Sequence, residues 1–65
     1  MQPKDEIREI LANWYRLRLE DVIVWSVDEL SFSKVECRAQ VWGAVYKFRI
    51  YRAPKGRILA VVTLA

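Results

Sequence analysis

The sequence of 65 residues contains no histidine and a single cysteine, Cys37. One cysteine cannot form a disulfide within the chain, and the usual tetrahedral zinc site cannot be built without histidine or further thiols. Histidine is also the commonest general base in enzymes. We therefore expect a protein without a metal, without a cofactor and without catalytic activity.

Long apolar runs and signature motifs are missing as well. No stretch approaches the roughly 20 apolar residues that cross a bilayer, and nothing resembles a nucleophile elbow, a P-loop or a dinucleotide fingerprint. The first ten residues, MQPKDEIREI, mix charges and lack the apolar core of a secretory signal. Together with the lone cysteine, this pattern predicts a cytoplasmic protein that has no membrane partner.

The short chain limits how much surface folding can bury. We predict a single α+β domain over residues 1–65, and a chain of this size buries only about 60% of the surface that its unfolded form exposes. Disulfides or a structural metal often compensate in small domains, but the composition excludes both. Association with further copies is the simplest remaining source of burial, so we expect a homo-oligomer, a dimer or larger.

Charge is distributed unevenly along the chain. Residues 1–33 carry four basic and seven acidic side chains, a net charge of −3, whereas residues 34–65 carry seven basic side chains against Glu36 alone, a net charge of +6. The second half therefore presents a positive field that favours an acidic protein partner, a nucleic acid or the acidic half of a second copy.

Apolar residues recur at spacings of three and four between residues 4 and 19, which predicts one amphipathic α-helix. The members of this stripe are Ile7, Ile10, Leu11, Trp14 and Leu17. Pro3 suits the first helical turn, where its missing N–H has no intrahelical partner to lose. We expect the stripe to close the core against a sheet.

The middle of the chain reads as strands. Residues 22–27, VIVWSV, are β-branched and apolar on both faces, which predicts a strand covered on both sides. Residues 28–33, DELSFS, predict a loop or a single helical turn. Alternation over residues 34–52 changes parity at Trp42-Gly43. We interpret this as a β-bulge in one long bent strand, and a two-residue hairpin turn, which needs positive φ at Trp42, is the alternative.

The segment Ala53-Pro54-Lys55-Gly56 has the residues of a tight turn, after which residues 57–64 return antiparallel. With Ala53 opposite Arg57, this register places Val62 on the core face and Val61 on the outer face. The predicted fold is α+β: an N-terminal helix packed on one face of a curved three-stranded antiparallel sheet, in the order αβββ with a long bent second strand.

On the outer face of this sheet we expect an apolar strip ringed by charge, a pattern typical of binding surfaces on small proteins. We hypothesise that this face packs against another copy, so that the protein is a small non-catalytic protein-interaction module. Trp42 is included because tryptophan is enriched in interfaces. The predicted interface residues are Lys47, Arg49, Tyr51, Leu59, Val61 and Trp42.

Nucleic-acid binding is an alternative, because basic residues interleaved with aromatic ones on a sheet suit backbone neutralisation and base stacking. No RNP-like, KH or helix-turn-helix signature accompanies them. The residues predicted for this alternative are Arg38, Lys47, Arg49, Tyr51, Arg52, Lys55 and Arg57.

The remaining candidates are a ligand pocket, the single cysteine and two pairs of neighbouring carboxylates. A small-ligand pocket between helix and sheet is a second alternative, lined by Trp14, Trp25, Tyr46 and Phe48. Cys37 falls on the apolar parity of its strand, which predicts a small buried hydrophobe rather than a reactive thiol. The carboxylate pairs are expected to be solvated loop charges rather than acid/base pairs. They are Glu20-Asp21 and Asp28-Glu29.

Overall fold

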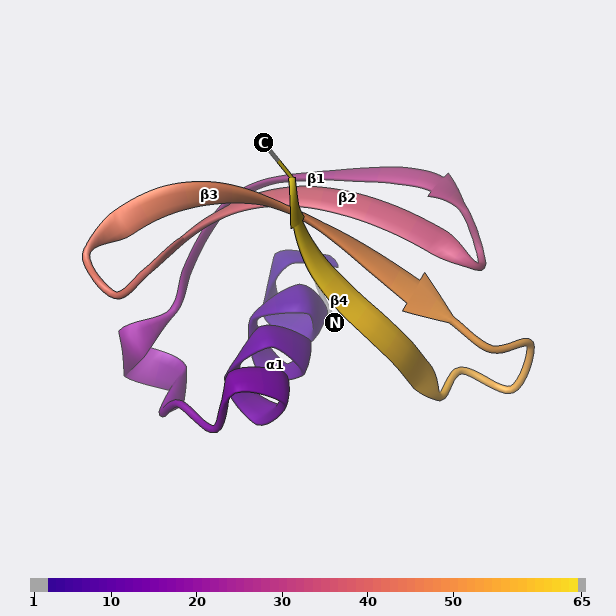
Figure 1. Ribbon diagram of the computed structural model, residues 1–65, viewed down its shortest axis with the longest axis horizontal. Helices are drawn as coiled ribbons and strands as arrows, with labels where there is room; N and C mark the ends of the chain where they lie inside the picture. The colour runs from indigo at the N-terminus through magenta and orange to yellow at the C-terminus, as the bar shows by residue number, and fades with distance from the viewer. Residues whose placement is uncertain (1–2, 65) are drawn as a thin grey trace.

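The computed structural model describes residues 3–64, and Figure 1 shows a helix lying beneath an arched sheet. The elements in chain order are α1 (Pro3–Tyr15), a short 3₁₀ helix η1 (Leu19–Asp21), β1 (Ile23–Ser31), β2 (Lys34–Val41), β3 (Ala44–Arg52) and β4 (Ile58–Leu64). The strands form one antiparallel sheet in the order β1-β2-β3-β4. The α+β class with one N-terminal helix is confirmed, but the predicted three strands are wrong because the described residues form four.

The predicted helix is present but ends at Tyr15 rather than at residue 19. The N–H of Leu17 donates to the carbonyl of Ala12 at 2.8 Å, the N–H of Arg16 donates to the carbonyl of Asn13 at 3.4 Å, and Arg16 has φ +58°. These bonds form a Schellman motif, whose left-handed position is usually glycine. Because arginine occupies it here, the sequence carries no visible stop signal.

β2 and β3 are separate strands joined by a two-residue turn, so the prediction of one long bent strand with a bulge is wrong. Trp42 and Gly43 both have positive φ, +52° and +78°, as a type I′ hairpin turn requires. The ring of Trp42 packs edge-on against Tyr15 and Tyr46, with centroids 5.0 and 6.4 Å apart. These contacts offset the cost of a positive φ at Trp42. No local sequence pattern predicts them.

Most side chains of β1 are exposed, so it is not the strand covered on both sides that was predicted. It lies at one edge of the sheet. It also extends through Ser31, so the predicted loop over residues 28–33 shrinks to a turn. Only Val24 and Val27 within it are partly buried. Its register with β2 shifts twice, leaving Trp25 and Leu30 as extra residues without an opposite partner.

The β3–β4 hairpin begins as predicted, with the N–H of Ala53 donating to the carbonyl of Arg57 at 2.8 Å. The register then shifts at Leu59, which has no opposite residue in β3. This extra residue reverses the parity of the rest of β4. Val61 therefore pairs with Ile50 and is 8% exposed, whereas Val62 is 38% exposed on the other face. The predicted placement of these two valines is wrong.

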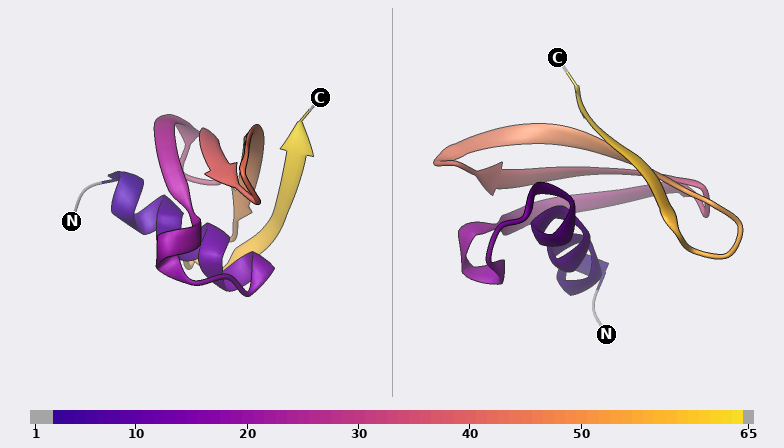
Figure 2. Two further views of the ribbon diagram at one scale, coloured as in Figure 1. Left: turned by 90° about the vertical axis from the view of Figure 1, so that its left-hand side faces the viewer. Right: turned by 60° about the horizontal axis from the view of Figure 1, so that its bottom comes forward.

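The core lies between α1 and the concave side of the sheet, and Figure 2 shows the strands curving over the helix. It consists of Ile7, Leu11, Ala12, Val22, Val35, Cys37, Ala39, Val41, Phe48, Ile50 and Val61. The helix contacts β1 far more than β4. The opposite, convex side of the sheet, here called the outer face, is left without a covering layer.

Candidate interaction surface

Glu36 is the centre of an ion-pair network on the outer face. The Nε of Arg49 donates to its Oε2 at 2.9 Å, and the Nζ of Lys47 lies 3.4 Å from its Oε1. The hydrogen bonds from Arg49 hold the pKa of Glu36 below its ordinary value, with the positive charge of Lys47 acting in the same direction. The Nη1 of Arg49 also approaches the hydroxyl of Tyr51 at 3.4 Å. Lys47, Arg49 and Tyr51 thus lie together on the outer face.

One apolar part of the outer face lies beside this network and belongs to β4. Ala60, Val62 and Leu64 are paired with Tyr51, Arg49 and Lys47 respectively, so their side chains share the outer face. We call these three residues the β4 strip. The sequence register missed them, because nothing in ILAVVTL marks the extra residue that brings them outward.

The two edges of the sheet differ in charge and in regularity. β1 has its two register shifts and carries Asp28 and Glu29. β4 contains no charged residue between Ile58 and Leu64, and its pairing with β3 is regular from Ala60 onward. Sheet edges are normally protected from other strands by charges, bulges or proline. The regular part of β4 has none of these.

Three predicted interface residues lie elsewhere. Val61 is in the core, so it cannot contact a partner. Leu59 is the extra residue at the start of β4 and is exposed. Trp42 is exposed at the β2–β3 turn, where its ring packs edge-on against Tyr15 and Tyr46, away from the β4 strip.

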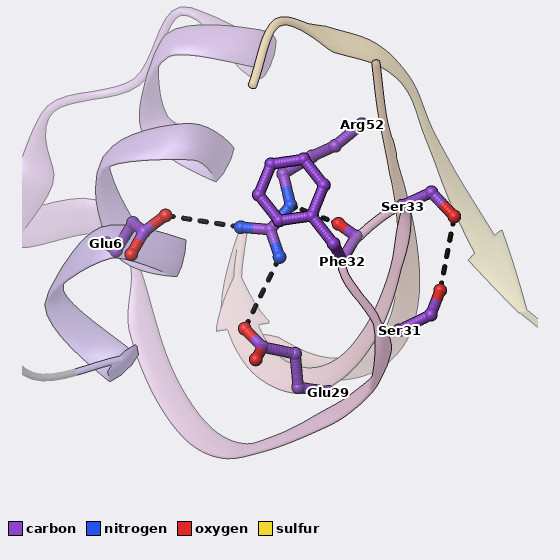
Figure 3. A network of polar contacts seen from close by, with 6 residues as sticks. All are labelled: Glu6, Glu29, Ser31, Phe32, Ser33 and Arg52. Carbon is purple, nitrogen blue, oxygen red and sulfur yellow. Dashed lines mark hydrogen bonds and ion pairs between the residues drawn. The ribbon is translucent and has the colours of Figure 1, made fainter. Parts of the chain in front are cut away.

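Arg52 is a buried charged residue that joins three elements (Figure 3). Its Nε donates to the carbonyl of Phe32 at 2.8 Å, and its guanidinium carbon lies 4.7 Å from the centre of the Phe32 ring. Its two Nη atoms each lie 3.3 Å from a carboxylate, one of Glu6 in α1 and one of Glu29 in β1. These contacts engage all three nitrogen atoms of the guanidinium. Arg52 is therefore not exposed to a phosphate in the way that the nucleic-acid alternative requires.

The other residues predicted for nucleic-acid binding are not brought to one place. Lys55 and Arg57 lie at the β3–β4 turn, whereas Arg38 is exposed on the outer face opposite Lys47. Lys47 and Arg49 already pair with Glu36. The structure therefore divides this set between the outer face, the turn and the Arg52 network.

The aromatic residues predicted to line a ligand pocket are also separated. Phe48 is fully buried and Trp25 is exposed on the β1 edge. The ring of Tyr46 packs at a tilt against Phe48, with ring centroids 6.0 Å apart, and edge-on against Trp42. Of the four predicted residues, only Tyr46 lines one of the four hollows described on residues 3–64, together with Arg38, Val45, Lys47 and Leu64.

Cys37 is buried as predicted, and burial raises the pKa of its thiol to about 11. The carboxylate pairs are charges in ion pairs or on strand faces. Glu20 and Asp21 both pair with Arg18. Neighbouring Asp28 and Glu29 fall on opposite faces of β1, and Glu29 reaches Arg52.

Residues 3–64 contain no cluster of cysteine and acidic side chains arranged to hold a metal ion. None of the helices in this range combines the length and the hydropathy of a membrane span. Comparison with protein-family models, with curated proteins and with solved structures finds no match.

Proposed function

We propose that this protein is a small non-catalytic protein-interaction module that self-associates on the β4 side of its sheet. The observation that carries the proposal is the uncharged, regular β4 edge beside the β4 strip, in which Val62 is exposed and Ala60 and Leu64 are half-buried. A short chain with one small core gains most from burying such a surface. The outer-face charges next to it are paired among themselves, so covering the strip leaves the Glu36 network intact.

The mass of the protein in solution tests this proposal directly. We expect light scattering on a sizing column to give a dimer or larger assembly at low and at moderate salt, because an apolar contact is little affected by screening. Val62→Asp places a charge in the β4 strip and should give a monomer that keeps its circular dichroism spectrum.

Ile23→Asp is the matched control, because Ile23 is an exposed residue on the outer face of the opposite edge strand. This variant should assemble like the unmodified protein. A monomeric unmodified protein would overturn the proposal. Binding to a labelled single-stranded oligonucleotide that weakens steeply with salt would then favour the nucleic-acid alternative.

A further inference from the structure

We infer that two copies join through β4 itself, antiparallel about a two-fold axis at Val62, so that the two sheets form one continuous sheet of eight strands. This inference rests on the proposed self-association and specifies how it occurs. An edge strand has one set of backbone N–H and C=O groups bonded to its neighbour and another directed outward. Regular, uncharged β4 offers that outward set over Ala60–Leu64.

The regular segment of β4 is complementary to itself in the antiparallel direction. Val62 is its middle residue, so pairing about this position sets Val62 opposite the Val62 of the second copy. Ala60 then lies opposite Leu64, a small side chain against a large one, and Val61 lies opposite Thr63. Directly opposed residues share a face. The pairing therefore opposes no charges and sets the two β4 strips side by side on the outer face, where each covers part of the other.

The basic side chains of the outer face do not oppose this arrangement. Arg49 is the β3 partner of Val62, so the two copies of Arg49 would be three strand spacings apart, about 14 Å. This separation exceeds the Debye length of about 8 Å at physiological salt. Each Arg49 is also paired with Glu36 in its own chain.

Pairing of β4 with β1 of another copy is disfavoured by the irregular, charged sequence of β1 and by the symmetry of the assembly that it would form. The register shifts at Trp25 and Leu30 leave β1 only a short regular run, Ser26–Glu29, which includes two carboxylates. Such a contact would also leave a free edge for each further copy and continue into a ring or an open filament, whereas a contact of β4 with itself closes as a dimer.

Cysteine cross-linking tests the position of the axis. Directly opposed Cα atoms in an antiparallel pair are about 4.5–5.5 Å apart, within the range that a disulfide spans. We expect Val62→Cys to form a disulfide-linked dimer under mild oxidation several-fold faster than Val45→Cys, which also carries its thiol exposed on the outer face but in β3. Ile23→Cys serves as the control on the opposite edge, and the unmodified protein as the control for buried Cys37.

A mixture of two variants tests the register. Ala60→Cys and Leu64→Cys should cross-link to each other when mixed and much less when each is oxidised alone, because the axis at Val62 sets residue 60 opposite residue 64. Cross-linking of Val62→Cys with Ile23→Cys would instead identify the contact of β4 with β1 and would overturn the inference.

Amide hydrogen exchange separates edge pairing from stacking of two outer faces. Raising the protein concentration should slow exchange in β4 and leave β1 unchanged, since only edge pairing gives the outward N–H groups of β4 a new acceptor. If the protein assembles but β4 amides exchange at the same rate as in the Val62→Asp monomer, this inference fails while the proposed function stands. A protein that is monomeric throughout contradicts both.

Discussion

The edge strands β1 and β4 bound the same sheet, yet they differ in what holds them. β1 packs against α1, has two register shifts and is tied at its far end through Glu29 to Arg52. β4 has little helix over it and a regular uncharged segment. Trp25 and Leu30 of β1 are more exposed than Val62. If the assembly proposed above forms, an uninterrupted ladder without charge identifies the edge that accepts another strand better than exposed apolar area does.

The largest effect that would test this comparison is expected at Val61, the residue that attaches β4 to the core. Val61→Asp buries an unpaired carboxylate and should cost roughly 3–5 kcal/mol, comparable with the stability of a small domain at about 5 kcal/mol. We expect urea titration followed by tryptophan fluorescence to find this variant largely unfolded.

Neighbouring Val62 provides the control, because the same substitution there faces solvent. Val62→Asp should remain folded and lose only its assembly. The reverse outcome, a folded Val61→Asp and an unfolded Val62→Asp, would support the register without the extra residue at Leu59. In that register Val62 is in the core and the β4 strip does not exist.

A smaller effect is expected at Arg52, which ties the end of β1 to α1 and β3. Arg52→Gln loses the charged contacts with Glu6 and Glu29, and because both carboxylates are more than half exposed, each contact contributes less than the roughly 1.5–3 kcal/mol of a buried hydrogen bond to a charged group. We expect a loss of about 2–3 kcal/mol in the free energy of unfolding, with faster amide exchange at the β1–β2 turn. The assembly of the folded fraction should persist, because β4 takes no part in the network. Loss of assembly in folded Arg52→Gln would place the contact on β1.

The smallest effect is expected from Glu36, which lies between the two edges. Its pKa is lowered in the folded state, so its contribution to stability is fully present above the ordinary pKa and is lost as the pH falls through the lowered folded value. Urea titrations at neutral pH and near pH 3 should therefore show a smaller loss for Glu36→Gln than for the unmodified protein. An identical pH dependence in the two proteins would mean that the ion pairs with Lys47 and Arg49 contribute nothing.

The parts of the fold that sequence reasoning identified have complete local signals. The helix has a periodic stripe, and the β3–β4 turn has Pro54 and Gly56 at the expected places. Sequence reasoning kept the hairpin at Trp42 only as the alternative, because the contacts with Tyr15 and Tyr46 that offset its strain are set by the fold. The preference of tryptophan for negative φ favoured the β-bulge, which is not what forms.

The candidate site was predicted only in part for a related reason. Lys47, Arg49 and Tyr51 alternate with buried residues of β3, so their outward direction follows from parity alone. The residues of β4 could not be placed this way, since nearly all of ILAVVTL is apolar and one extra residue at Leu59 exchanges the two faces without changing the pattern. An edge strand such as β1 is equally hard to recognise, because solvent on one side removes the constraint on its residues.

The contacts of Arg52 also have a consequence for the order of folding. Its carboxylate partners are separated from it by 46 and 23 residues along the chain, whereas each hairpin of the sheet closes over a short turn. The hairpins can form early, but the Arg52 network needs α1, the β1–β2 turn and β3 in place together. Removing it should therefore speed unfolding more than it slows folding. We therefore expect the Arg52 contacts to form after the sheet and to lengthen the lifetime of the native state.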